Sequence, residues 1–433
     1  MAIVAPSTST STSASEPSAS YAVPLTIVTT LFFMWGFLTC LNDILVPHLK
    51  PIFDLNYKEI MLIQFAFFGA YFIFSIPSAK VIDWIGYQRS MVVGLLTMGV
   101  GAFLFVPAAS VPSYPLFLMA LIVLAAGITC LQVAANPYVT VLGKPQTASS
   151  RLNLTQAFNS LGTFLAPFFG GLLILTAAPL TIQEIRALAP DALQAYRLHE
   201  AATVKLPYIG LGIALVLLAV AIGSFKLPKI PHAQHAVGEK VNDSIWRHPN
   251  LIFGALAIFV YVGAEVSIGS FLVNYFSQPD IGGLTEKAAA SFVAFYWGGA
   301  MVGRFIGSGL LQKMKTGHLL GICAVCAAAL VAISMMSTGH FAMGSIILVG
   351  FFNSIMFPSI FTLGVAELGP LTGDGSGVMI MAIVGGAIIP LAQGAVADRI
   401  GIHHAFFLPV ICYLYILFFA LSGSKPNSER ARA

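Results

Sequence analysis

Residues 90–143 read SMVVGLLTMGVGAFLFVPAASVPSYPLFLMALIVLAAGITCLQVAANPYVTVLG and contain no Asp, Glu, Lys or Arg. One helical membrane crossing takes about 20 apolar residues, so this segment is long enough for two crossings. The sequence VPS at 111–113 supplies a tight turn between them. Residues 316–366 are equally free of charge and turn at STG, 337–339. Paired crossings at matching places in the two halves predict a duplicated membrane protein.

The composition of the whole chain agrees with this interpretation. Of 433 residues, 58% are hydrophobic and 9% are charged, whereas soluble domains carry about 25% charged residues. A soluble enzyme is therefore excluded, and the lipid bilayer is the expected environment. The net charge of +4 is small and dispersed, so no nucleic-acid partner is expected. Cys323 and Cys326 form a CxxC pair, but no second pair or nearby His completes a metal site, so neither a metal nor a cofactor is predicted.

Breaking the apolar runs at charged or Pro/Gly-rich segments predicts an all-α membrane protein with twelve transmembrane helices. These helices are expected at residues 22–50, 58–82, 88–109, 114–142, 152–178, 204–225, 249–277, 288–310, 317–337, 340–365, 374–397 and 403–422. No Walker loop and no Ser/His/Asp arrangement accompanies them, so no enzymatic or ATP-driven activity is predicted.

An internal repeat supports two pseudo-symmetric six-helix bundles. Pro137 and Pro358 are each followed by a glycine six residues later, at an offset of 221. Further matches pair Pro167 with Pro390 at an offset of 223 and Gly36 with Gly263 at an offset of 227. Such a repeat predicts two halves related by an axis along the membrane normal.

The predicted domain boundaries follow from this repeat. They are a disordered N-terminal tail at 1–20, an N-terminal bundle at 21–225, a cytoplasmic linker at 226–248, a C-terminal bundle at 249–423 and a C-terminal tail at 424–433. Fourteen of the 21 Lys and Arg residues fall on the side that carries both termini. Because cytoplasmic loops are enriched in Lys and Arg, both termini are predicted to be cytoplasmic.

Polar residues inside these apolar helices are functional candidates, because burying them in lipid is costly unless they are paired or face water. Asp43 follows Asn42 in the first helix, with Thr39 one turn earlier and Trp35 two turns earlier. An aromatic face beside hydrogen-bonding groups suits a sugar ring, whose C–H faces stack while its hydroxyls need partners. The competing interpretation is that Asp43 is simply hydrated near the extracellular end of a helix that closes at Pro47.

Two further helices of the first half carry amides. Gln132 and Asn136 lie one turn apart before a proline, and we expect Gln132 to bind a ligand and Asn136 to pack. In the fifth helix a polar stripe must face the bundle interior, and its members are Asn153, Gln156, Asn159 and Thr163. We expect Gln156 and Asn159 to meet a ligand.

The second half does not repeat these groups exactly. Glu265 shares a helix face with Tyr261, and three roles stay open for it: binding a ligand, binding a cation, or a structural hydrogen bond. The weaker candidates for the cavity are Gln64, Trp297, Asn353 and Gln393. A separate set at the cytoplasmic ends of the helices predicts gating by charge pairing, and it comprises Asp83, Arg89 and Arg304. Asp83 is expected to accept from a helix N-terminus or from Arg89.

The sequence resembles the major facilitator superfamily, and within it the fucose/glucose-galactose permease branch. The resemblance is carried by FFMWGFLTCLNDILVP (32–47), QVAANPYVTVLG (132–143), RLNLTQAFNSLGTFLAP (151–167) and YVGAEVSIGSFLVNY (261–275). It implies a cation-coupled sugar symporter of the bacterial inner membrane that works by alternating access. It also implies that Asp43 couples transport to protons and that Gln156 and Asn159 line the sugar cavity.

One departure from the family pattern affects the coupling ion. This chain has Gln132 where the fucose permease has a glutamate, so a two-carboxylate relay cannot be carried over. Either Asp43 titrates alone, or it stays ionised and holds Na⁺ with neighbouring oxygens, so H⁺ and Na⁺ both remain open.

Together these features predict a symporter that imports a hexose, either glucose or galactose. The family that the sequence resembles implies that it acts as a monomer. Trp35, Thr39, Asn42, Gln132, Gln156, Asn159, Glu265 and Asn353 are expected to line the substrate cavity. The alternatives are an importer of fucose or of an N-acetylated sugar in the same fold, or a drug or amphiphile exporter.

Overall fold

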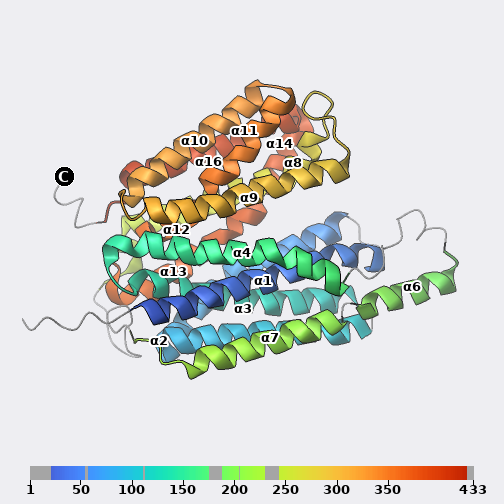
Figure 1. Cartoon of the computed structure of the whole chain (residues 1–433), viewed down its shortest axis with the longest axis horizontal. Coiled ribbons are helices and arrows are strands. Elements are labelled where there is room, and N and C mark those ends of the chain that lie inside the picture. Colours follow the sequence, from blue (N-terminus) through green and yellow to red (C-terminus); the bar gives the residue numbers. More distant parts are fainter. Residues whose placement is uncertain are drawn as a thin grey trace, which may run out of the picture.

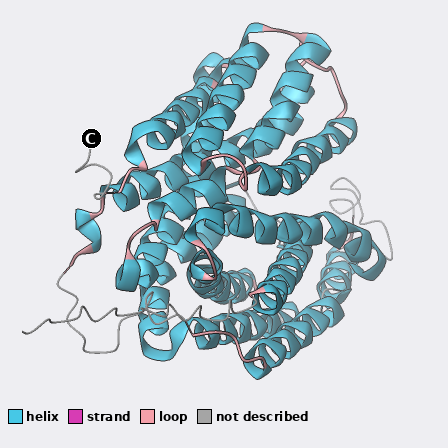
Figure 2. Ribbon diagram, turned by 60° about the vertical axis from the view of Figure 1, so that its left-hand side comes forward, coloured by secondary structure: helices cyan, strands magenta, loops and turns pink. Residues whose placement is uncertain are grey.

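A computed structural model describes residues 21–53, 57–110, 113–174, 188–203, 205–229 and 243–426. Side chains are described throughout these ranges except at 41–53, 57–61, 167–174, 197 and 199–203. All regular secondary structure in the described chain is helical, and short loops connect the helices (Figure 2).

The N-terminal bundle contains long helices that pack on one another. They are α1 (Ala22–Phe53), α2 (Tyr57–Ser110), α3 (Tyr114–Val141), α4 (Ala148–Ile174) and α7 (Lys205–Ser224), with the shorter η1 (Pro145–Thr147) and α6 (Pro190–Thr203) between them. α2 packs on α3 and α7, and α1 packs on α4.

The C-terminal bundle follows a short 3₁₀ helix, η3 (Ile245–Arg247). Its continuous helices are α8 (Pro249–Phe276), α9 (Glu286–Leu310) and α10 (Thr316–Met336). The remaining chain forms shorter pieces: α11 (Gly339–Asn353), α12 (Met356–Gly364), η4 (Gly369–Leu371), α13 (Thr372–Met381), η5 (Ala382–Val384), α14 (Gly385–Ile400), α15 (Ile402–Ala405), α16 (Phe407–Phe418) and η6 (Phe419–Gly423).

These elements make twelve membrane crossings. Ten described stretches are long and apolar enough to span a bilayer, and one of them, Leu62–Ser110, is long enough for two crossings. It bends at Gly86, whose φ of 80° lies in the region that glycine adopts most easily. The polar helix α4 is the remaining crossing. The predicted fold class of twelve helices is therefore confirmed, although three of the predicted helices are broken into shorter pieces.

The innermost crossings of the two halves are built alike. α1 crosses α4 and α8 crosses α14, and each helix contributes a glycine at the crossing point. A Cβ atom would collide with the partner helix at all four positions, which are Gly36, Gly162, Gly263 and Gly385. Small residues let membrane helices approach this closely. Gly36 and Gly263 are the pair matched by the sequence repeat, so the duplication is visible in the packing.

The two bundles lie side by side and touch mainly toward one end (Figure 1). This end carries the start of α1 at Ala22 and the end of η6 at Gly423, and we call it the termini face. Here α13 packs on α2 and α3, while α4 packs on α9 and α12. Most of the predicted tails and linker lies outside the described residues, so those domain boundaries stay predictions.

Candidate functional site

A cavity of about 520 Å³ lies between the two bundles. The N-terminal bundle lines it with α1 and α4, and the C-terminal bundle lines it with α8 and α9. The lining residues are Cys40, Asn159, Ser160, Thr163, Phe164, Glu265, Ala294, Trp297, Ala300, Met301 and Arg304. Pockets of 300–1,000 Å³ with a few placed polar groups are typical of small-molecule sites. The cavity is therefore the candidate site.

The polar stripe of α4 is divided between the cavity and the protein interior. Asn159 lines the cavity, and its Nδ2 donates to the Phe32 carbonyl oxygen on α1 (2.9 Å), so the amide is held in place. Its Oδ1 makes no hydrogen bond to the described residues. Gln156 is 7% exposed and donates to Asn136 Oδ1 (3.3 Å), behind the cavity wall. Only the part of the stripe around Asn159 and Thr163 reaches the cavity.

Glu265 faces this stripe from α8. Its Oε1 accepts a hydrogen bond from Tyr261 Oη (2.8 Å), and that hydroxyl also lies 3.1 Å from the carbonyl oxygen of Asn353. The tyrosine fixes the carboxylate, because it is itself fully buried in the bundle. Oε2 has no hydrogen-bond partner among the described residues, so it is available to a ligand.

Asn353 lies behind this tyrosine and not on the cavity wall. It is fully buried, its Nδ2 donates to Tyr296 Oη (2.8 Å), and its Oδ1 accepts from Tyr413 Oη (2.8 Å). Every polar atom of the side chain thus has a protein partner, which leaves none for a substrate in this structure.

Arg304 lines the cavity and connects the two bundles. Its Nε donates to the Ser354 carbonyl oxygen (3.3 Å) within the C-terminal bundle, and its Nη1 donates to Ser160 Oγ across the interface. Its Nη2 has no partner among the described residues. The residue predicted for gating therefore also borders the candidate site.

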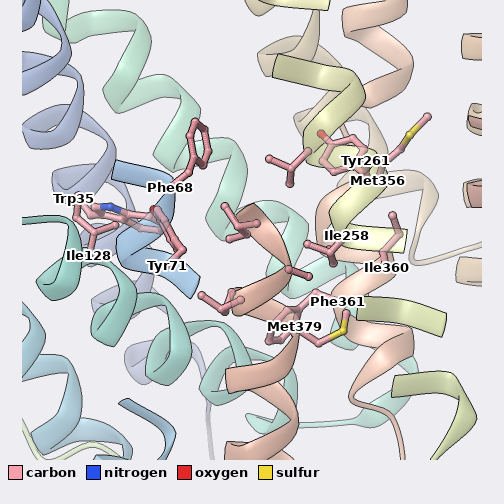
Figure 3. Close-up of a cluster of buried hydrophobic side chains, with 14 of the residues drawn as sticks. Trp35, Phe68, Tyr71, Ile128, Ile258, Tyr261, Met356, Ile360, Phe361 and Met379 are labelled. Carbon is pink, nitrogen blue, oxygen red and sulfur yellow. The ribbon is translucent and has the colours of Figure 1, made fainter. Parts of the chain in front are cut away.

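Trp35 and Gln132 do not line this cavity. Trp35 is 7% exposed and lies in the core of the N-terminal bundle, near Tyr71 and Ile128 (Figure 3). Gln132 is 6% exposed and donates to Tyr71 Oη (2.7 Å). Thr39 donates to the carbonyl oxygen of Trp35 within its own helix (2.9 Å). Two other aromatic residues line the cavity: Phe164, and Trp297, which was a weaker candidate from the sequence.

Asn42 and Asp43 belong to α1, but their side chains lie outside the described residues. Their predicted roles in substrate binding and ion coupling therefore stay predictions. Cys40, three residues before Asp43, lines the cavity.

Two seams join the bundles on the termini-face side of the cavity. In the ionic seam, Lys80 Nζ of α2 pairs with Asp374 Oδ1 of α13 (2.8 Å) and with Asp83 Oδ2 (3.5 Å). In the neutral seam, Asn153 Nδ2 of α4 donates to the Arg304 carbonyl oxygen (2.7 Å) and to Ser308 Oγ (3.1 Å) of α9.

Of the two partners expected for Asp83, Arg89 does not pair with it, and Lys80 does so instead. Lys80 and Asp83 are three residues apart on one helix, which places them on the same face. Gly86 ends that arm of α2 before Arg89, which is exposed and forms no ion pair with the described residues. The local reason for the difference is thus the bend at Gly86.

A family model described as the Major Facilitator Superfamily matches residues 27–383, which is more than half of the chain. The chain belongs to the Major Facilitator Superfamily. Its members are transporters, so the transporter described here is not an enzyme.

Two relatives place the transporter within the superfamily. The glucose/galactose transporter of Brucella abortus is 54% identical over 405 residues, which cover 94% of this chain and 95% of that protein. The L-fucose-proton symporter of Escherichia coli K12 is 36% identical over 419 residues, which cover 94% of each chain. The transporter therefore belongs to the branch that holds both proteins.

A solved structure supports the same assignment. The crystal structure of the transporter FucP in the outward conformation superposes with a TM-score of 0.87 at 34% identity, covering 94% of this chain and 99% of that one. The fold of two pseudo-symmetric six-helix bundles is therefore shared.

Sequence reasoning missed several residues of the site. Ser160 and Phe164 adjoin the predicted stripe of α4, but their residue types are common in apolar helices. Asp374, the partner of Lys80, was also missed, although an acid in a helix start rich in glycine was a detectable signal.

Proposed function

We propose that this transporter imports a hexose, glucose or galactose, together with a cation, by alternating access. The observation that carries the proposal is the cavity between the bundles, where the amide of Asn159 and the carboxylate of Glu265 border one space. Sugar hydroxyls need hydrogen-bond partners when they leave water, and charged or amide groups supply them. The 54% identity to a protein named as a glucose/galactose transporter supports the choice of sugar.

The relatives favour a sugar importer over a drug or amphiphile exporter, because one that is 54% identical is named as a glucose/galactose transporter. The lining also offers hydrogen-bonding groups for a sugar, since five of its eleven residues are polar or charged: Asn159, Ser160, Thr163, Glu265 and Arg304. They come from both bundles, so a ligand between the bundles meets hydrogen-bonding groups on either side.

We assign ion coupling to Asp43. Residues three apart in a helix share a face, so Asp43 shares the face of Cys40, which lines the cavity. An acid at this depth must be neutralised by a proton or by a bound cation before the site can close around it. The coupling ion is H⁺ or Na⁺. A relative is named as an L-fucose-proton symporter, which favours H⁺. This chain has Gln132 where the fucose permease has a glutamate, which leaves Na⁺ open.

We further propose that the termini face is cytoplasmic, in a bacterial inner membrane. Lys80, Arg89 and Arg304 lie toward this face, as expected for the side of a membrane protein that stays in the cytoplasm. Because both seams are formed here, the structure then corresponds to the outward-facing state. The relative with the same fold was solved in an outward conformation.

Sugar counterflow separates binding from coupling, because exchange of labelled for unlabelled sugar needs no ion gradient. Asp43→Asn is expected to abolish gradient-driven uptake of glucose or galactose into vesicles while exchange persists. Asp280→Asn, which changes an exposed acid between α8 and α9, is the matched control and should retain both activities. If Asp43→Asn keeps gradient-driven uptake, the coupling assignment is wrong.

The same vesicles identify the ion and the sugar. Uptake is measured with a Na⁺ gradient at equal pH, and with a pH gradient in the absence of Na⁺. Glucose, galactose, fucose and N-acetylglucosamine serve as competitors. A wild-type protein that neither accumulates nor exchanges any of these sugars would show that the proposed function is wrong.

A further inference from the structure

The wall of the cavity formed by α8 and α9 combines an exposed indole with an acid and a guanidinium. Trp297 is 45% exposed, and Glu265 and Arg304 line the same space. The indole ring is the largest aromatic surface in the lining. These three groups lie on the C-terminal bundle, opposite the amide of Asn159.

The indole of Trp297 is held in position by its neighbours. Its ring lies against Gly269 of α8, where a Cβ atom would come within 3.0 Å of Cζ2. Tyr296 makes an edge contact with the indole, with ring centroids 5.1 Å apart and planes at 82°. Because Gly269 leaves room for the ring, Trp297 is positioned as a fixed surface.

The two charged groups are also held by partners that leave one atom of each unused. Tyr261 fixes Oε1 of Glu265, and Ser160 and the Ser354 carbonyl fix Nη1 and Nε of Arg304. A hydroxyl group both donates and accepts, so a carboxylate oxygen and a guanidinium nitrogen are complementary to two hydroxyls of one ring. Hydrogen bonds to charged groups are about twice as strong as neutral ones.

We propose that Trp297, Glu265 and Arg304 form a sugar subsite on the C-terminal bundle, in which the indole stacks on the apolar face of a pyranose while the acid and the guanidinium bind two of its hydroxyls. This inference rests on the proposed function and assigns the aromatic platform to α9. Trp35 does not serve as that platform, because it is 7% exposed and packed in the N-terminal core (Figure 3). Asn159 lines the same cavity from the other bundle.

The first test removes the aromatic surface. Trp297→Ala is expected to weaken hexose binding, measured as the half-saturation concentration of counterflow, by about tenfold, while Trp297→Phe retains much of the affinity because a smaller ring still stacks. The matched control is Trp246→Ala, which removes an exposed tryptophan of η3 outside the cavity. Equal affinity of Trp297→Ala and the wild type would overturn the proposal.

A spectroscopic test does not depend on transport. The chain contains four tryptophans, and a sugar stacked on one of them changes its fluorescence. Hexose added to the purified protein should change the emission of the wild type and of Trp246→Phe, but not that of Trp297→Phe. A sugar-dependent signal that survives in Trp297→Phe would place the platform elsewhere.

The polar half of the subsite is tested with deoxy sugars. Glu265→Gln keeps the acceptor for Tyr261 but loses the negative charge, and it should weaken binding of the full hexose by about tenfold. For the monodeoxy sugar that lacks the hydroxyl bound by Glu265, the variant and the wild type should bind equally. If the loss is the same for every monodeoxy sugar, Glu265 does not contact a hydroxyl. Failure of the wild type to bind any hexose would instead reject the proposed function.

Discussion

The two seams on the termini-face side of the cavity differ in their chemistry. In the ionic seam, the side chain of Lys80 is 48% exposed, and its partners Asp83 and Asp374 are 8% and 17% exposed. In the neutral seam, Asn153 is fully buried and bonds to the backbone and a hydroxyl of α9. One seam is therefore in contact with water and ions, and the other is shielded from both.

This difference separates two contributions to closure. An exposed ion pair contributes about 0.2–1 kcal/mol and is weakened by salt, since the Debye length falls from about 10 Å at 0.1 M to about 3 Å at 1 M. A buried neutral hydrogen bond contributes about 0.5–1.5 kcal/mol and is not screened. We expect the neutral seam to set how stable the closed termini face is, and the ionic seam to make that stability depend on salt.

The largest effect is expected for Asn153→Leu, which removes two bonds of the neutral seam at nearly constant volume. The closed termini face should lose about 1–2 kcal/mol, or about tenfold in its population ratio. Cys40 lines the cavity, so in a variant with Cys40 as its only cysteine, labelling by an impermeant maleimide from the opposite face reports that population. Labelling should become slower as the fraction with a closed termini face falls.

The matched control for this change is Thr155→Val. Thr155 is also buried in α4, but its hydroxyl donates to the Leu152 carbonyl oxygen in the same helix (2.8 Å) and makes no bond to the other bundle. Cys40 in the Thr155→Val variant should be labelled at the same rate as in the parent variant, whose only cysteine is Cys40. If Asn153→Leu behaves like the control, the neutral seam does not hold the termini face closed.

A smaller effect is expected for Ser376→Ala beside the ionic seam. Ser376 Oγ of α13 donates to the Val133 carbonyl oxygen of α3 (2.8 Å), and the serine is fully buried. Loss of this one neutral bond should lower the ratio of the closed to the open termini face by about fivefold, equally at low and high salt. A shift that disappears at high salt would show that Ser376 acts through the neighbouring ion pair and not through its own bond.

Much of this fold could be predicted from the sequence, because it depends on local patterns. The charge-free segments, the proline spacing and the paired Gly36 and Gly263 follow from the length and packing of membrane helices. The breaks near Ser354 and at η5 were not predicted. For the first of them Pro358 was a detectable signal, because proline lacks the N–H that would bond to the Ser354 carbonyl oxygen within the helix.

The candidate site was only partly predictable, because helical phase shows which residues share a face but not what that face meets. Asn159 and Glu265 were expected at the cavity and line it. Trp35 has the right residue type and depth, yet the N-terminal core covers it, while Trp297 lies in the lining. That distinction depends on how the two bundles dock, which is a contact between residues far apart in sequence.

The smallest effect is expected for Lys80→Gln, and it sharpens the comparison because it depends on salt. At 0.1 M salt the variant should shift the labelling of Cys40 by about threefold or less, in the same direction as Asn153→Leu. At 1 M salt the variant and the wild type should differ less, since screening weakens the attraction to Asp374. Lys313→Gln, at a lysine with no ion pair among the described residues, should change nothing at either salt concentration. A shift for Lys80→Gln that is the same at both concentrations would mean that the lysine stabilises closure by packing, and the two seams would then not differ in kind.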